Sequence, residues 1–157
     1  MSRSTRDELV SSVEDQCRAY HVAVDQVDEA VAVCAHVNRT DLRCLDILER
    51  LGPLSAGELA TASGLTTGAV TTVLDRLEAV GYARRERDVD DRRRVLVDVT
   101  EEVRAAAREL YGPLATAHAE AYADFSHDEL GVIRELLCRS REVNERHASW
   151  LRSRLAG

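Results

Sequence analysis

The chain has 157 residues, of which 31% are charged and 4% are aromatic, and its formal net charge at pH 7 is −7. This length suffices for one domain with appended helices, and its core must be aliphatic because aromatic residues are so few. Met1–Asp7 is polar and no apolar run reaches the roughly 18 residues of a membrane span, so we expect a cytoplasmic protein without a signal peptide.

A long helix is predicted from Thr5 to about Ala35, because apolar residues recur there at steps of three and four. The stripe comprises Leu9, Val13, Cys17, Tyr20, Val24, Val27, Val31 and Cys34. Little else in the chain can cover so long a stripe. It therefore favours a partner surface over the alternative, an ordinary core helix.

A second helix is predicted over about 41–51, with Thr40 as its N-cap and Gly52-Pro53 after its end. Cys34 and Cys44 lie in apolar helical contexts, so we expect both to be buried free thiols. Leu54 is expected to add a brief third strand to the hairpin described below.

Two short helices separated by a tight turn follow. Ser55 and Glu58 form an S-x-x-E capping box at the start of the first, and Gly64 ends it. Thr66 or Thr67 caps the second, which extends to about Val80. The apolar face of this second helix comprises Val70, Val73, Leu74, Leu77 and Val80. Its opposite, small and polar face comprises Gly68, Thr71, Thr72, Asp75 and Ala79.

A β-hairpin is predicted after these helices, with strands at 82–87 and 95–99. Val95, Val97 and Val99 alternate and are expected to point inward. The tip, residues 88–94, reads Asp-Val-Asp-Asp-Arg-Arg-Arg, and aspartates suit a tight turn. The hairpin therefore presents arginines at its end.

The remaining chain is predicted to be helical. Thr100 is the expected N-cap of a helix that Gly112-Pro113 should kink or break, because proline cannot donate to the helix ladder. Ser126 and Glu129 form a second capping box, which begins the last helix. The inward residues expected on the last helix are Leu130, Ile133, Leu137, Val143 and Leu151.

Helix, turn, helix and hairpin in this order predict a winged helix-turn-helix, in which the second helix enters the DNA major groove. Small residues allow close approach to base edges, and Thr offers both a hydroxyl and a methyl group. Arg76 flanks the polar face and is expected to reach a phosphate, whereas Asp75 should pair with an arginine. The expected DNA contacts are Thr66, Thr67, Gly68, Thr71, Thr72, Arg76, Arg92 and Arg93.

The negative charge of the chain does not rule out DNA binding, because it lies mostly outside the predicted DNA-binding segment. Residues 66–94 carry seven arginines and six acids, a net charge of +1, which leaves −8 for the rest of the chain. We therefore expect modest non-specific affinity for DNA and specific binding that weakens steeply with salt.

About a third of the chain resembles the MarR (multiple antibiotic resistance regulator) family. The resemblance rests on Leu54-Ser55, Glu58-Leu59-Ala60, Ser63-Gly64-Leu65, Val70-Thr71, Asp75-Arg76-Leu77-Glu78, Gly81-Tyr82, Arg84-Arg85, Asp88, Asp91-Arg92-Arg93 and Thr100. It implies a homodimeric transcriptional regulator that binds double-stranded DNA and often a small phenolic or aromatic effector. It also implies that Arg93 enters the minor groove and that Asp91 braces the wing. Thr72 departs from the family, many members of which have an arginine there, so the base preference does not carry over.

The expected fold is mainly α with a small β-wing. Residues 1–37 are expected to form a dimerisation helix, 38–100 the DNA-binding lobe and 101–157 the C-terminal dimerisation helices. The expected function is a homodimeric repressor that responds to a ligand and binds a palindromic operator.

Two alternatives compete with this function. Some relatives sense oxidants through a cysteine on the first helix, which makes Cys17 a candidate redox sensor, although its surroundings differ from that subgroup. A protein-interaction scaffold that does not bind DNA is the other alternative.

Neither a metal-ligand cluster nor a catalytic motif is visible, so we expect no enzyme activity, no metal and no cofactor. Ligand-binding residues are unknown from the sequence; the candidates by chemistry alone are His36, Tyr111, His118 and Tyr122.

Overall fold

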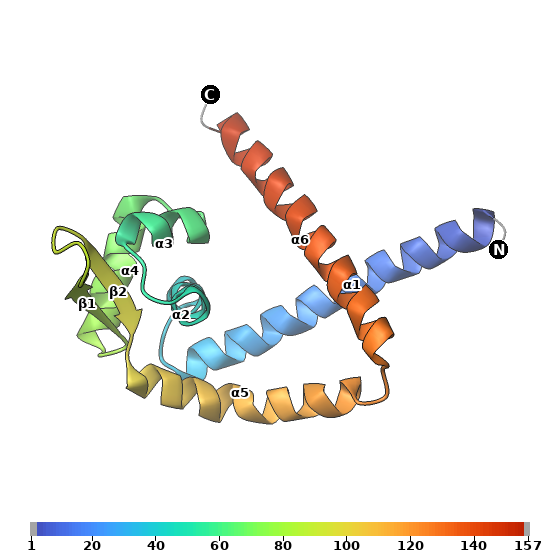
Figure 1. Cartoon of the computed structure of the whole chain (residues 1–157), viewed down its shortest axis with the longest axis horizontal. Helices are drawn as coiled ribbons and strands as arrows, with labels where there is room; N and C mark the ends of the chain where they lie inside the picture. Colours follow the sequence, from blue (N-terminus) through green and yellow to red (C-terminus); the bar gives the residue numbers. More distant parts are fainter. Residues whose placement is uncertain (1–2, 156–157) are drawn as a thin grey trace. The chain divides into compact units, whose positions relative to one another are not determined.

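The computed structural model describes residues 3–155, and their secondary structure is almost entirely helical apart from one hairpin (Figure 1). The elements in order are α1 (Arg3–Cys34), α2 (Arg39–Leu51), α3 (Ala56–Ser63), α4 (Thr67–Ala79), β1 (Ala83–Arg87), β2 (Val95–Val99), α5 (Glu101–Tyr122) and α6 (His127–Leu155). The chain divides into two compact units, Met1–Gly112 and Pro113–Gly157. None of the described helices is long and apolar enough to cross a membrane.

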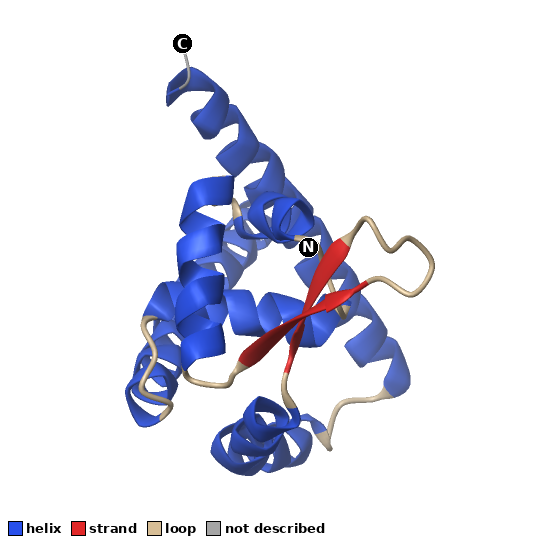
Figure 2. Ribbon diagram, turned by 90° about the vertical axis from the view of Figure 1, so that its left-hand side faces the viewer, coloured by secondary structure: helices blue, strands red, loops and turns tan. Residues whose placement is uncertain are grey.

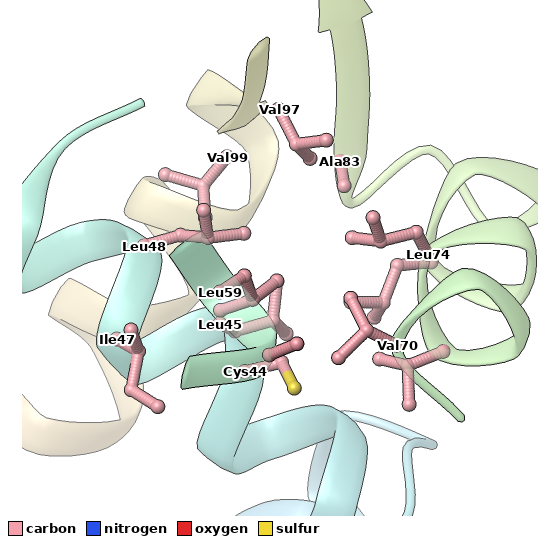
Figure 3. Close-up of a cluster of buried hydrophobic side chains, with 13 residues drawn as sticks. Cys44, Leu45, Ile47, Leu48, Leu59, Val70, Leu74, Ala83, Val97 and Val99 are labelled. Carbon is pink, nitrogen blue, oxygen red and sulfur yellow. The ribbon is translucent and has the colours of Figure 1, made fainter. Parts of the chain in front are cut away.

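The core of the first unit lies between α2, α3, α4 and the two strands, whose apolar side chains converge (Figure 3). It consists of Cys44, Leu45, Ile47, Leu48, Leu59, Ala60, Val70, Val73, Leu74, Leu77, Ala83, Val97 and Val99. No aromatic residue belongs to this buried cluster, as the composition led us to expect. The core holds the helix-turn-helix and the hairpin together as one lobe.

The helix boundaries follow from local capping. Ser55 and Glu58 form the predicted capping box, Gly64 ends α3 in the left-handed conformation at φ 70°, and Thr66 caps α4 through its side chain. The expectation that Thr40 caps α2 is wrong. Asn38 is the N-cap, and its side chain accepts from the backbone N–H of Asp41 at 2.9 Å.

The two strands form an antiparallel hairpin in which Ala83 pairs with Val99 and Arg87 with Val95 (Figure 2). Leu54 forms one isolated bridge to Val97 with backbone bonds of 3.0 and 2.7 Å, so the predicted third strand is a single bridge. Val97 and Val99 are buried as predicted, whereas Val95 is exposed because it pairs with Arg87 next to the tip of the hairpin, beyond the core.

Helix α5 continues through Pro113, so the break expected at Gly112-Pro113 as one alternative is wrong, and the other alternative, a kink, stays a prediction. Proline removes its own N–H from the ladder of this 22-residue helix, and helices can continue through such a residue with a kink. Ser126 and Glu129 form the second predicted capping box, at the start of α6. The residues of α6 that were expected to point inward are exposed in the single chain: Leu130, Ile133, Leu137, Val143 and Leu151.

Candidate nucleic-acid interface

Helix α4 presents a clear outward face. Its four buried residues are Val70, Val73, Leu74 and Leu77, all at most 2% exposed. Val80, which the sequence pattern assigned to the same face, is 55% exposed, because α4 has already ended at Ala79 and the chain turns through Gly81 at φ 75°. The exposed surface of α4 includes the predicted contacts Thr67, Gly68, Thr71 and Thr72.

The hydroxyl groups of this face are held by the helix itself. Thr71 Oγ1 donates to the carbonyl of Thr67 at 3.0 Å, and Thr72 Oγ1 donates to the carbonyl of Gly68 at 3.2 Å. The methyl groups and hydroxyl lone pairs therefore remain available to an incoming surface. A Cβ added at Gly68 would meet nothing within 4 Å, so protein packing does not require glycine there.

Arg76 lies one turn beyond Thr72, but its guanidinium group is already bound. Its Nε donates to Asp41 Oδ2 at 3.1 Å and its Nη2 to Asp41 Oδ1 at 2.5 Å. This hydrogen-bonded pair raises the pKa of Arg76. Sequence reasoning missed Asp41 because it is 35 residues away on α2 and belongs to no recognised DNA-binding pattern.

Asp75 pairs with an arginine, as predicted. Arg85 of β1 donates to Asp75 Oδ1 at 2.9 Å and also forms an ion pair with Glu78. One guanidinium group of the first wing strand therefore offsets part of the charge of two acids of α4, which reduces their repulsion of a polyanion.

Aspartates shape the tip of the wing. Asp88 Oδ1 accepts from the backbone N–H groups of Asp90 at 2.8 Å and Asp91 at 3.4 Å. The backbone also closes on itself, because the Arg94 N–H donates to the carbonyl of Asp91 at 2.8 Å. The turn is therefore ordered by its own residues.

The three arginines of the tip differ in their contacts. Arg93 is bound to Asp91, whose Oδ1 accepts from the Arg93 backbone N–H at 3.1 Å and from its Nε at 3.2 Å. Both hydrogen bonds from Arg93 lower the pKa of Asp91, and the backbone bond has the larger effect. The side chain of Arg93 is nevertheless 92% exposed, and Arg92 is exposed too. Arg94 points back to Glu58 of α3.

The cysteines and histidines give no comparable site. Cys44 is buried as predicted and burial raises the pKa of its thiol, whereas Cys34 is exposed, contrary to expectation, because it ends α1. Cys17 is half-buried on α1. Among the described residues, no three His, Cys, Asp or Glu side chains lie close enough together to hold a metal ion.

Two of the four candidate ligand residues line cavities: Tyr122 lies with Phe125 and Leu130 in the wall of a cavity of about 460 Å³, and Tyr111 lines another. The cavity at Tyr111 has a volume of about 530 Å³, and Val24, Asp28, Arg39, Leu42 and Arg43 also line it. Tyr111 donates to Asp28 at 3.2 Å, and burial raises the pKa of its phenol. His118 and Tyr122 stack on each other with ring centroids 5.6 Å apart, and His36 is exposed after the end of α1.

Comparison with known proteins agrees with this geometry. The MarR family model matches residues 37–95, the segment that contains the helix-turn-helix and most of the wing. The helix-turn-helix-type transcriptional regulator YcgE of Bacillus subtilis is 32% identical over 92% of this chain and 94% of its own length. The chain belongs to the MarR family.

Solved MarR family structures share the fold. A MarR family protein from Bacillus stearothermophilus covers 88% of this chain and 97% of its own at a TM-score of 0.67 and 21% identity. NadR in complex with 4-hydroxyphenylacetate covers 80% of this chain and 88% of its own at a TM-score of 0.61 and 20% identity. The predicted fold class, mainly helical with a small β-wing, is therefore confirmed, as is the assignment to a family of DNA-binding transcriptional regulators.

Proposed function

We propose that this MarR family protein is a homodimeric repressor that binds a palindromic operator and is released by a small aromatic effector. The observation that carries the proposal is the combination, on one lobe, of a small polar face on α4 and an arginine-tipped wing. The proposed DNA contacts are Thr66, Thr67, Gly68, Thr71, Thr72, Arg92 and Arg93, with Asp91 as wing support and Arg76 at the end of the same helix face.

The face of α4 fits the major groove. Gly68 leaves the first turn of the helix open, and the methyl groups of Thr71 and Thr72 can contact a thymine methyl group. The hydroxyl oxygens, whose hydrogens are donated to helix carbonyls, can accept from adenine or cytosine amino groups. Recognition by contact of this kind needs no arginine on the helix.

The wing supplies the positive charge that α4 lacks. Asp91 holds the backbone and the Nε of Arg93, so the side chain leaves the turn in a fixed direction while remaining exposed. A guanidinium group presented in this way fits a narrow minor groove, where the negative potential is enhanced. Arg92 is exposed beside it and is available to a phosphate.

The exposed apolar surface supports a dimer of two copies of this chain. On α1, Leu9, Tyr20 and Val24 are exposed, and Val31 and Ala32 near its end are its only buried side chains in the described part of the chain. On α6, the exposed apolar residues continue from Leu130 to Leu151. Each of these exposed apolar helix surfaces, taken by itself, is of the kind that marks an interface, and obligate dimers cover such surface with a second copy.

A two-fold dimer places two α4 helices against two halves of a DNA site, which is why we propose a palindromic operator. Repression would follow from occupying promoter DNA. The acidic remainder of the chain keeps the non-specific affinity for DNA low. Most of the affinity for the operator must therefore come from the specific contacts.

The proposed effector is a phenolic or other aromatic acid. The cavity at Tyr111 has the volume of a typical ligand site. Its lining combines apolar side chains with two guanidinium groups, of Arg39 and Arg43, and two carboxylates, of Asp28 and Asp46, and Arg39 is ion-paired with Asp28. The structural neighbour NadR was solved with 4-hydroxyphenylacetate, an aromatic acid. Such a ligand would release DNA by binding one state of the dimer more tightly than the other.

Selection from a random duplex library followed by fluorescence anisotropy tests the proposal. We expect one enriched palindromic sequence, bound more tightly than a scrambled duplex, with an affinity that decreases linearly with the logarithm of salt concentration. A promoter that carries the selected site should be repressed by the protein in a reporter strain. Failure to enrich any sequence would favour the scaffold alternative, and activation of the reporter would contradict repression.

A further inference from the structure

The carboxylate of Asp41 is a buried charge between α2 and α4. Its side chain is 5% exposed and lies in the first turn of α2, where the helix dipole favours an anion. Three N–H groups reach it: Asn38 Nδ2 at 2.9 Å, Arg76 Nε at 3.1 Å and Arg76 Nη2 at 2.5 Å. The two arginine bonds form a bidentate pair, the geometry that fixes direction as well as distance.

This pair constrains the orientation of α4. Arg76 and Thr72 are four residues apart and therefore share one face of the helix. The hydrophobic effect itself is not directional, so it fixes which side of α4 is buried rather than the exact rotation of the helix. A planar guanidinium group that binds both oxygens of one buried carboxylate does not tolerate a change in this rotation, because the paired bonds would be lost.

The first turn of α2 is also bonded to α1. Arg39, two residues before Asp41, forms ion pairs with Asp25 and, at 3.3 Å, with Asp28 of α1. The same turn therefore contacts α1 through Arg39 and α4 through Asp41. The first turn of α2 therefore links the position of α4 to that of α1.

We propose that Asp41 is a positioning residue for DNA recognition, which holds Arg76 and thereby sets the rotation of α4 that presents Thr72 to the base edges. Arg76 serves this pair and is not a free phosphate contact. The inference rests on the proposed function, since it assumes that α4 reads the major groove. It adds a residue of α2 to the determinants of specificity, although that residue does not touch DNA.

Four variants test the inference: Asp41→Asn, Arg76→Gln, Arg76→Lys and the double variant Asp41→Asn/Arg76→Gln. Each full-length protein is measured by anisotropy on the selected operator and on a scrambled duplex at several salt concentrations, below its own melting temperature. Glu86→Gln is the matched control, because it removes the same charge and breaks the exposed pair between Arg84 and Glu86 of β1, whose atoms are 3.0 Å apart.

Each single variant should lower the ratio of operator to scrambled affinity by about 10-fold or more, the scale of one mismatched base pair. The double variant should be no worse than the poorer single variant, because both remove the same pair. The dependence on salt should stay unchanged, and the control should keep the wild-type ratio. Arg76→Lys is informative because lysine keeps the charge but cannot form the bidentate pair.

A phosphate contact would give a different pattern. Arg76→Gln would then weaken binding to both duplexes and reduce the salt slope by about one per arginine removed, while Asp41→Asn would bind as tightly as the wild type or more tightly. That pattern would overturn the inference, as would a wild-type affinity ratio in Arg76→Lys or Asp41→Asn. If the wild-type protein prefers no sequence, the proposed function itself fails, and the inference fails with it.

Discussion

Arg94 of the wing donates to both carboxylate oxygens of Glu58, at 2.9 and 3.1 Å. The same carboxylate accepts from the backbone N–H of Ser55 at 2.8 Å and so completes the capping box of α3. One side chain therefore closes the start of α3 and anchors the base of the wing tip. Because Arg94 is engaged in this way, the two preceding arginines are the ones that the wing presents outward.

This relationship predicts a dependence of stability on acid. Hydrogen bonds from Ser55, together with the charge of Arg94, lower the pKa of Glu58 below its usual value of 4.5. A carboxyl whose pKa is lower in the folded state stabilises the protein above its unfolded pKa, and this stabilisation is lost as the pH falls through the folded pKa. The melting temperature should therefore decrease as the pH is lowered below about 4.5, because the unfolded chain binds more protons than the folded protein in this range.

Glu58→Gln checks the acid prediction. The variant should melt at a lower temperature than the wild type near neutral pH. The difference should shrink as the pH falls through the lowered folded pKa of Glu58, because the wild-type carboxyl then loses its charge. Circular dichroism melts across this range measure both effects. A difference in melting temperature that is constant over the whole range would show that the charge of Glu58 contributes nothing.

Arg93→Ala should leave the protein folded yet weaken operator binding by about 1–3 kcal/mol, the usual value of one good arginine contact. The side chain is 92% exposed and contacts Asp91 of its own turn, so its removal costs little stability. Anisotropy on the selected operator measures the change. Arg139→Ala, which removes an exposed arginine of α6, is the control, and unchanged affinity in Arg93→Ala would remove the wing from recognition.

Leu77→Asp should unfold the DNA-binding lobe, because Leu77 is fully buried and an unpaired charge in the core is very costly. Leu77→Ala should fold with a loss of about 2–5 kcal/mol in the free energy of unfolding. Val80→Asp, three residues on and 55% exposed, is the matched control and should be tolerated. Urea unfolding followed by circular dichroism distinguishes the three, and a stable Leu77→Asp variant would contradict the assigned helix face.

Leu137→Asp should shift the protein from dimer to monomer if the exposed apolar surface of α6 is the interface between two copies. Leu137 is 53% exposed in the single chain, so the substitution costs the monomer little. Val132→Asp places the same charge at a position that is 71% exposed and outside the predicted stripe, and it should remain a dimer. Light scattering coupled to size-exclusion chromatography gives the mass, and a dimeric Leu137→Asp variant would place the interface elsewhere.

Features encoded by neighbouring residues were predictable from the sequence. The capping boxes at Ser55 and Ser126, the glycine that ends α3, and the strand 95–99 were predicted correctly. Each depends on atoms within a few residues of one another, so local chemistry decides it. Errors arose at the ends of elements, as at Val80, which follows α4, and Val95, which begins β2. A further error arose where two polar residues separated by one position, Asn38 and Thr40, could each have capped α2.

The sequence by itself therefore determined the family, the order of elements and the outward face of α4, because these follow from helical spacing and short motifs. Only the tertiary structure decided which arginines are engaged. Asp41 and Arg76 are separated by 35 residues and Glu58 and Arg94 by 36, and no local rule relates such positions. The packing of α2, α3, α4 and the wing on their common core decides which charged side chains meet. Whether an arginine is paired or exposed to solvent is therefore known only from the folded lobe.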